Sequence, residues 1–84
     1  MNQVNEHQEE CLNILQEECA EVIVEASKIL RFDNDSSRLE EEIGDVICMI
    51  ELLYEQGIID PYNVAIQARE KREKLKKWSN IEDL

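Results

Sequence analysis

Two stretches of the chain combine apolar residues at helical spacing with a pair of acids three residues apart. The pairs are Glu18 with Glu21 and Glu42 with Asp45. Residues three apart are neighbours on one face of a helix, so each pair forms a local cluster of carboxylates. This pattern predicts two amphipathic helices that pack together through their apolar stripes.

Each acid pair has the same position relative to its apolar stripe. At about 100° per residue, each stripe centres about 80° from Glu18 or Glu42, and Glu21 or Asp45 lies about 60° to the other side. If the helices pack face to face and antiparallel, both pairs open onto one gap. The stripes contain Leu12, Leu15, Cys19, Val22, Ile23, Ala26, Ile29 and Leu30 in the first helix, and Leu39, Ile43, Val46, Ile47, Ile50, Leu53 and Tyr54 in the second.

Carboxylates gathered from two helices repel one another, so either some stay protonated or a cation lies among them. Hard oxygen ligands of this kind suit Mg²⁺, Mn²⁺ or Ca²⁺. The alternative is a solvated helix surface, because 20 of the 84 residues are Asp or Glu and pairs three apart arise by chance. The matched angular offset favours a shared site.

Capping signals divide the chain into three helices, so we expect an all-α fold. The helices are predicted over residues 6–31, 38–55 and 61–78. Ser37 with Glu40 is a capping box for the second helix, and Gly57 ends it. Asp60 followed by Pro61 begins the third.

The length of 84 residues predicts one domain, residues 1–84, with residues 1–5 frayed. A chain this short has a marginal core, and small domains often gain stability by oligomerising. The second helix carries a further apolar patch, which we expect to contact a third helix or another subunit. Its residues are Cys48, Met49 and Leu52. We therefore predict a homo-oligomer, a dimer or tetramer, that completes a four-helix bundle.

The net charge of −11 disfavours binding to nucleic acid or to an anionic membrane. No apolar run approaches the ~20 residues of a membrane span, and the polar start of the chain lacks a signal peptide. The three cysteines form no C-x-x-C motif, which favours reduced thiols and a cytoplasmic protein.

Six of the nine Lys and Arg residues lie in the third helix. Basic residues near the end of a helix complement its dipole. In an otherwise acidic chain, Lys71 and Lys74 are also candidates for binding phosphate. Both interpretations stay open for these two lysines.

In the order and helical context of its acid pairs and its basic third helix, the chain resembles the MazG-like members of the all-α nucleoside triphosphate pyrophosphatase superfamily. The resemblance rests on an E-E-x-x-E motif at Glu17, Glu18 and Glu21, an E-x-x-D motif at Glu42 and Asp45, and the basic third helix. It covers about residues 11–78.

The resemblance implies that Glu18, Glu21, Glu42 and Asp45 bind Mg²⁺, for which Mn²⁺ can substitute. It also implies that Glu17 acts near the attacking water. The expected reaction is hydrolysis of an NTP or dNTP between its α- and β-phosphates, giving a monophosphate and pyrophosphate.

Two alternatives stay open beside that reaction. One is hydrolysis of phosphoribosyl-ATP, an activity found in the same superfamily. The other is a non-catalytic acidic interaction module or degenerate family member, because Gln67 and Ala68 stand where many relatives have an Asn before the lysine.

Overall fold

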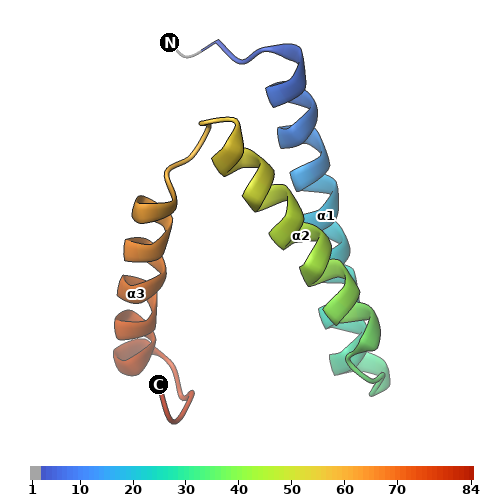
Figure 1. The fold of residues 1–84 in the computed structure, drawn as a ribbon. Coiled ribbons are helices and arrows are strands. Elements are labelled where there is room, and N and C mark those ends of the chain that lie inside the picture. The colour runs from blue at the N-terminus through green and yellow to red at the C-terminus, as the bar shows by residue number, and fades with distance from the viewer. Residues whose placement is uncertain (1–2) are drawn as a thin grey trace.

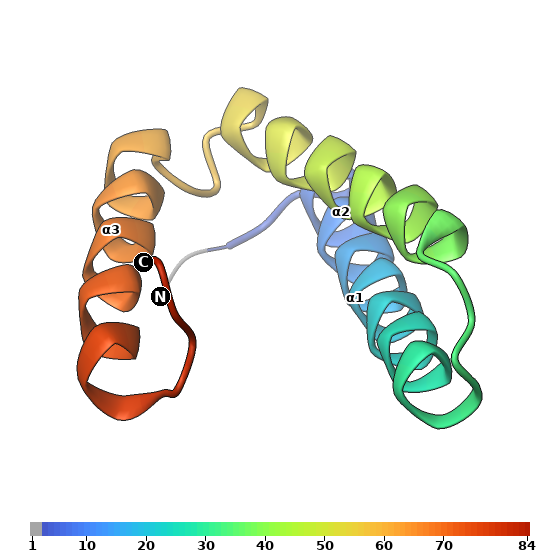
Figure 2. The ribbon, with the colours of Figure 1, turned by 90° about the horizontal axis from the view of Figure 1, so that it is seen from below.

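In the computed structural model, which describes residues 3–84, these residues form three helices and no strands. Helix α1 spans Glu6–Phe32, α2 spans Ser37–Glu55 and α3 spans Pro61–Trp78. The all-α prediction is confirmed. Helices α1 and α2 form an antiparallel hairpin, whereas α3 stands away from both (Figure 1, Figure 2).

Helix α1 begins with a capping box. The Asn5 side chain accepts from the Gln8 backbone N–H at 2.8 Å, and the Gln8 side chain accepts from the Asn5 N–H at 3.0 Å. These bonds satisfy two N–H groups at the helix start. The fraying of residues 1–5 stays a prediction. Met1 and Asn2 lie outside the described residues.

Helix α2 begins one residue earlier than the sequence predicts. Its N-cap is Ser36, and the Ser37 N–H donates to Asp35 Oδ1 at 2.9 Å. The predicted capping box between Ser37 and Glu40 is wrong, because Ser37 is already helical and the Glu40 carboxylate accepts from the Ser36 hydroxyl at 3.1 Å.

The start of α3 is as predicted. Asp60 is the N-cap, and its Oδ1 accepts from the Tyr62 N–H at 2.7 Å. Pro61 follows at the first helical position, where a missing N–H is tolerated.

The two helices of the hairpin meet along a seam whose residues are spaced alternately three and four apart. Every seam residue is buried or half-buried. The seam comprises Cys11, Leu15, Glu18, Val22, Glu25 and Ile29 of α1, with Leu39, Glu42, Val46, Met49 and Leu53 of α2. Such spacing keeps one narrow face of each helix against its partner. Two of the predicted metal ligands, Glu18 and Glu42, therefore lie in the seam itself.

The buried apolar residues of the seam are Cys11, Met49 and Leu53. Met49 packs in the α1–α2 core, so the prediction that it faces a third helix or another subunit is wrong. Leu52 also packs against this core, whereas Cys48 of the same patch is exposed.

Several residues of the predicted stripes are exposed instead of buried. They form what we call the apolar flank: Cys19, Ile23 and Leu30 of α1 with Ile43 and Ile47 of α2. Exposure reaches 70% for Ile23 and 87% for Leu30. Each predicted stripe combined the seam with the apolar flank. On α1 the seam centres about 20° from Glu18, whereas Ile23 lies about 140° from Glu18.

The apolar flank lies on one side of the hairpin. Ile43 and Ile47 lie about 100° and 140° from Glu42, as Cys19 and Ile23 do from Glu18. In two antiparallel helices that meet through equivalent faces, equal offsets point to the same side. The hairpin therefore has one exposed apolar side built from both helices.

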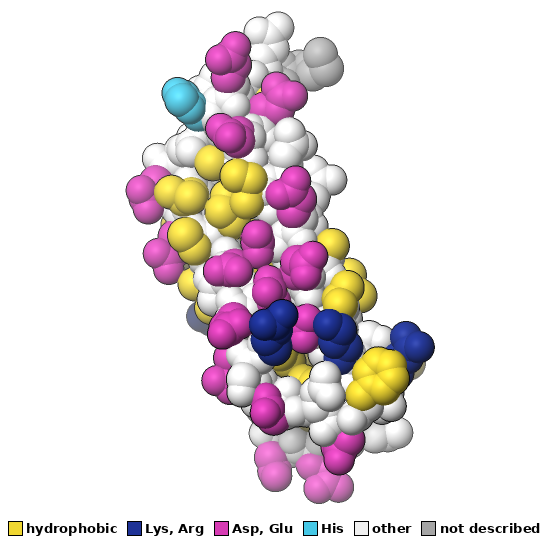
Figure 3. All heavy atoms as spheres, turned by 90° about the vertical axis from the view of Figure 1, so that its right-hand side faces the viewer, with side chains coloured by type: hydrophobic (Ala, Val, Ile, Leu, Met, Phe, Trp, Pro, Cys, Tyr) yellow, Lys and Arg dark blue, Asp and Glu magenta, His cyan; other side chains and the backbone are white. Residues whose placement is uncertain are grey.

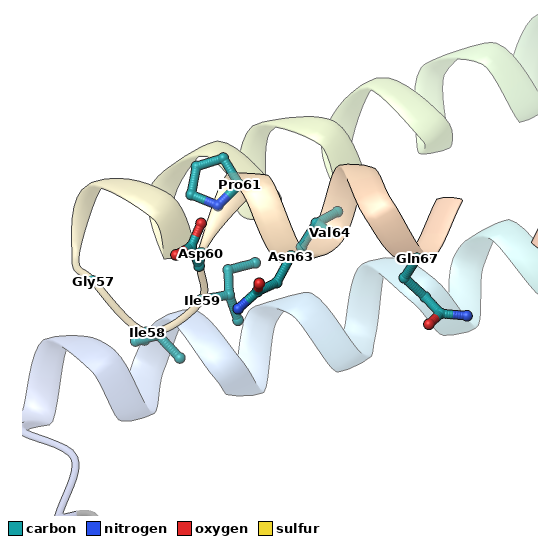
Figure 4. Close-up of a pocket in the computed structure, with 8 residues that line it drawn as sticks. All are labelled: Gly57, Ile58, Ile59, Asp60, Pro61, Asn63, Val64 and Gln67. Atoms are coloured by element: carbon teal, nitrogen blue, oxygen red, sulfur yellow. The ribbon is translucent and has the colours of Figure 1, made fainter. Parts of the chain in front are cut away.

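The elbow between α2 and α3 is fixed by local contacts. Gly57 adopts a left-handed φ of 72°, and the Ile58 N–H donates to the Leu53 carbonyl at 3.0 Å. Ile58 and Ile59 pack against the hairpin core, and their side chains turn toward α1 (Figure 4). The elbow therefore sets the direction in which α3 leaves the hairpin. Helix α3 itself buries none of its residues.

Candidate metal centre

Three carboxylates from the two helices of the hairpin meet at the middle of the seam. Single oxygens of Glu18, Glu42 and Asp45 all lie within 4.8 Å of one another. Glu42 and Asp45 are neighbours on one face of α2 because they are three residues apart. Antiparallel packing brings Glu18 of α1 against them. The predicted convergence of the two acid motifs is thus present for three of the four residues.

The pKa of Glu18 is raised above its ordinary value of 4.5 by this environment. Burial in the seam is the main cause, and the charge of Asp45 and a hydrogen bond with its carboxyl add to it. The charges of Glu42 and Glu21 raise it further. Glu18 therefore holds a proton more readily than a free carboxyl when no cation is near.

Glu21 lies next to this cluster but outside the group of three. It is one turn beyond Glu18 on α1, close enough for its charge to raise the Glu18 pKa, and its side chain is exposed. Glu17 is also exposed. At about 100° per residue, Glu17, Glu21, Glu41 and Asp45 lie about 80–120° from the centre of the seam, opposite the apolar flank. We call these four residues the acid flank.

Since α2 lies in front of α1 in Figure 1, with α3 to the left, the right-handed turn of both helices directs the acid flank away from α3. Figure 3 views the side of the molecule opposite α3, where acidic side chains gather around a small hydrophobic patch and Lys and Arg side chains lie below them. Lys71 and Lys74 are exposed residues of α3. The hairpin stands between α3 and the acid flank, so the chain does not bring these lysines to its own carboxylate cluster.

The donor set suits a small divalent cation. Mg²⁺ binds oxygen at about 2.0–2.1 Å, so two ligands on opposite sides of the ion lie about 4.2 Å apart. A group of oxygens within 4.8 Å is close to that requirement. All three donors are carboxylates, which favour Mg²⁺ or Mn²⁺ over a soft metal. Glu18, Glu42 and Asp45 would hold the ion.

Sequence reasoning missed Glu25, a buried acid in the seam. Only 6% of the residue is exposed, and its Oε2 lies 3.4 Å from Lys28 Nζ. The signal was present, because Glu25 is seven residues after Glu18 and occupies the equivalent seam position two turns on. The predicted stripe placed the buried face too far round the helix to include it.

An open hollow lies at the elbow between α2 and α3 (Figure 4). The residues that line it are Gly57, Ile58, Ile59, Asp60, Pro61, Asn63, Val64 and Gln67. None of the predicted site residues is among the residues that line it. The hollow is therefore separate from the carboxylate cluster.

A model of the MazG nucleotide pyrophosphohydrolase domain matches residues 6–79, which include the carboxylate cluster and α3. No curated protein and no solved structure matches the chain. Within residues 3–84, no helix combines the length and apolarity needed to cross a bilayer. Since the family model covers most of the chain and the acids of both motifs meet across its hairpin, the chain belongs to the MazG nucleotide pyrophosphohydrolase domain family.

Proposed function

We propose that the protein hydrolyses an NTP or dNTP between the α- and β-phosphates, giving a nucleoside monophosphate and pyrophosphate, with Mg²⁺ required and Mn²⁺ able to substitute. The observation that carries this proposal is the convergence of Glu18, Glu42 and Asp45 in a chain of the MazG family. Three carboxylates within 4.8 Å repel one another, so a cation that neutralises them has a ready site.

The charge of the chain also favours a cation-dependent reaction. A triphosphate is repelled by a protein of net charge −11, and most strongly by the carboxylate cluster. A divalent ion held there would supply positive charge against the phosphates and a more acidic water. The residues that hold it are Glu18, Glu42, Asp45 and, after a rotation of its side chain, Glu21.

Glu17 is proposed to take the proton from the attacking water. It is exposed, and it lies one turn from Glu21 on the acid flank, where a bound triphosphate is accessible to water. A bond forms between the water oxygen and the α-phosphorus, and the bond from that phosphorus to the bridging oxygen breaks. The pyrophosphate leaves with the electron pair of the broken bond.

A homo-oligomer, a dimer or tetramer, is proposed as the active form. The radius of gyration is 15.5 Å, whereas a compact chain of this length has about 12 Å. Such an extended shape leaves the apolar flank and the apolar residues of α3 uncovered. Pairing of two hairpins through their apolar flanks would form a four-helix bundle and bury Ile23, Leu30, Ile43 and Ile47. A cytoplasmic location is proposed from the three free cysteines.

A panel of NTPs and dNTPs with Mg²⁺ tests the reaction, with pyrophosphate and orthophosphate measured separately. We expect pyrophosphate as the first product from at least one nucleotide and no product in excess EDTA. Asp45→Asn should abolish the activity, and Glu51→Gln, on the far exposed side of α2, should keep it. Orthophosphate as the first product would count against the proposed reaction. No hydrolysis of any nucleotide would count against it too and would favour a non-catalytic interaction module.

A further inference from the structure

Helix α3 carries an apolar stripe with a lysine at its centre. The stripe residues are spaced alternately four and three apart, so they lie on one face of the helix. They are Val64, Ala68, Lys71, Leu75 and Trp78. Trp78 is 83% exposed and Leu75 is only half-buried. This docking stripe has no helix packed against it within the described part of the chain.

The charges of α3 and of the hairpin are opposite. Helix α3 has six basic and two acidic residues, whereas residues 6–55 have three basic and fifteen acidic residues. An apolar stripe with Lys71 at its centre fits a surface where carboxylates lie among apolar side chains. The acid flank is such a surface, because Val24 and Cys48 are exposed beside Glu21 and Asp45.

The elbow prevents α3 from docking on its own acid flank. The linker is held by the bond from the Gly57 N–H to the Tyr54 carbonyl at 3.0 Å and by the packing of Ile58 and Ile59 on the core. These contacts direct α3 to the side of the hairpin opposite the acid flank (Figure 1, Figure 3). The matching surface must therefore come from another molecule.

We propose that the docking stripe of α3 packs on the acid flank of a second copy of this chain and brings Lys71 and Lys74 to the carboxylate cluster of that copy. Two hairpins paired through their apolar flanks fit this arrangement. The second copy then turns its acid flank outward, on the side to which α3 extends. The contact stands on the geometry, and only the role of the lysines as phosphate ligands rests on the proposed function.

Zero-length cross-linking of the full chain tests the contact without any nucleotide. Equal amounts of ¹⁴N- and ¹⁵N-labelled protein are denatured together, refolded and treated with a carbodiimide, which joins a lysine to a carboxylate that touches it. We expect peptides containing Lys71 or Lys74 to be joined to peptides containing Glu21 or Asp45, with one light and one heavy partner. The Glu73–Lys76 pair, at 2.9 Å within α3, is the internal control and should always carry a single label.

Two results would overturn the proposal. One is a link from Lys71 or Lys74 to the acid flank in which both peptides always carry the same label. The other is the absence of such links while Glu73 and Lys76 are joined. The matched variants are Lys71→Glu and Arg69→Glu, which change the charge equally but lie about 200° apart on α3. Lys71→Glu should remove the mixed-label links, and Arg69→Glu should leave them.

An activity experiment separates this contact from the proposed function. Copies carrying Glu18→Gln and copies carrying Lys71→Glu, each inactive alone, are mixed under the same refolding conditions. Recovery of pyrophosphate release would show that one copy supplies the carboxylates and the other the lysine. Mixed-label cross-links from a protein that hydrolyses no nucleotide would support the contact and count against the proposed function. Mixed-label cross-links from an active wild type without recovery in the mixture would overturn the role of Lys71 in the site of the second copy.

Discussion

Glu18 of α1 and Asp45 of α2 bring carboxylate oxygens within 4.8 Å of each other, and the charge of Asp45 helps to raise the pKa of Glu18. A proton and a divalent cation are two ways to relieve the same repulsion. They therefore compete at this position, and cation binding should release a proton and strengthen as pH rises.

The first prediction concerns stability without metal. A carboxyl whose pKa is raised by folding stabilises the protein fully below its unfolded pKa, here about 4.5, and that contribution is lost as pH rises through the folded pKa. Glu18→Gln removes this dependence. In EDTA, the variant should therefore melt at a higher temperature than the wild type at pH 7, and the difference should shrink toward pH 4.5.

Thermal melts over this pH range, with circular dichroism as the readout, check the prediction. Glu51→Gln is the matched control, because it removes one acid from an exposed position on the far side of α2. The difference in melting temperature between Glu51→Gln and the wild type should not shrink toward pH 4.5 in this way. A Glu18→Gln difference that grows as pH falls would contradict the raised pKa.

The second prediction concerns the metal ligands. Saturating Mg²⁺ should stabilise the wild type by about 2.7 kcal/mol at a hundredfold excess over Kd. Glu18→Gln, Glu42→Gln and Asp45→Asn should lose most of this gain, because each removes an oxygen donor from the cluster. Glu21→Gln should lose less, since its carboxylate lies outside the group of three. Chemical denaturation with EDTA and with Mg²⁺ measures each value.

Glu51→Gln again serves as the control and should gain as much from Mg²⁺ as the wild type does. Equal gains for the wild type and all four site variants would mean that the two acid motifs do not form one metal site. A full loss in Glu21→Gln would show that this side chain turns into the cluster when the ion binds.

The sequence was sufficient to predict the helices and the meeting of the acid motifs. Helix ends follow from local signals such as Asp60 before Pro61, and these are readable one helix at a time. The convergence of Glu18 with Glu42 and Asp45 was predictable because both motifs have the same offset from the apolar residues. That inference requires only that both motifs have the same offset from the apolar residues of their helices. It therefore holds even though the predicted direction of the buried face was wrong.

The direction of the buried face could not be predicted as well. Apolar residues on α1 cover both the seam and the apolar flank, so their average lies between Val22, which is half-buried, and Ile23, which is exposed. Composition cannot separate a face that packs within the chain from a face left for a partner. The position of α3 was also beyond sequence reasoning, because it is set by the packing of Ile58 and Ile59 at the elbow.

The third prediction tests the buried acid that the sequence analysis missed. Glu25→Leu should raise the free energy of unfolding by about 1 kcal/mol, because an apolar residue at a buried seam position replaces a charge whose desolvation is costly. Lys28 would lose its partner, but its side chain is 43% exposed and remains solvated. Urea denaturation measures the change. Glu41→Leu, at an exposed position on α2, should stay within about 0.5 kcal/mol of the wild type, and a Glu25→Leu protein less stable than the wild type would contradict the prediction.

The fourth prediction concerns the apolar flank. Ile23→Glu and Ile47→Glu should weaken self-association at least tenfold, about 1.4 kcal/mol, because each places a charge where two flanks would otherwise bury isoleucines. Sedimentation equilibrium over a range of concentrations measures the association constant. Asn13→Glu is the control, since it adds the same charge to an exposed position of α1 about 140° from Glu18, on the side away from the apolar flank. The prediction fails if the wild type sediments as a 9.9 kDa monomer. It also fails if Asn13→Glu dissociates the oligomer as strongly as the two isoleucine variants do.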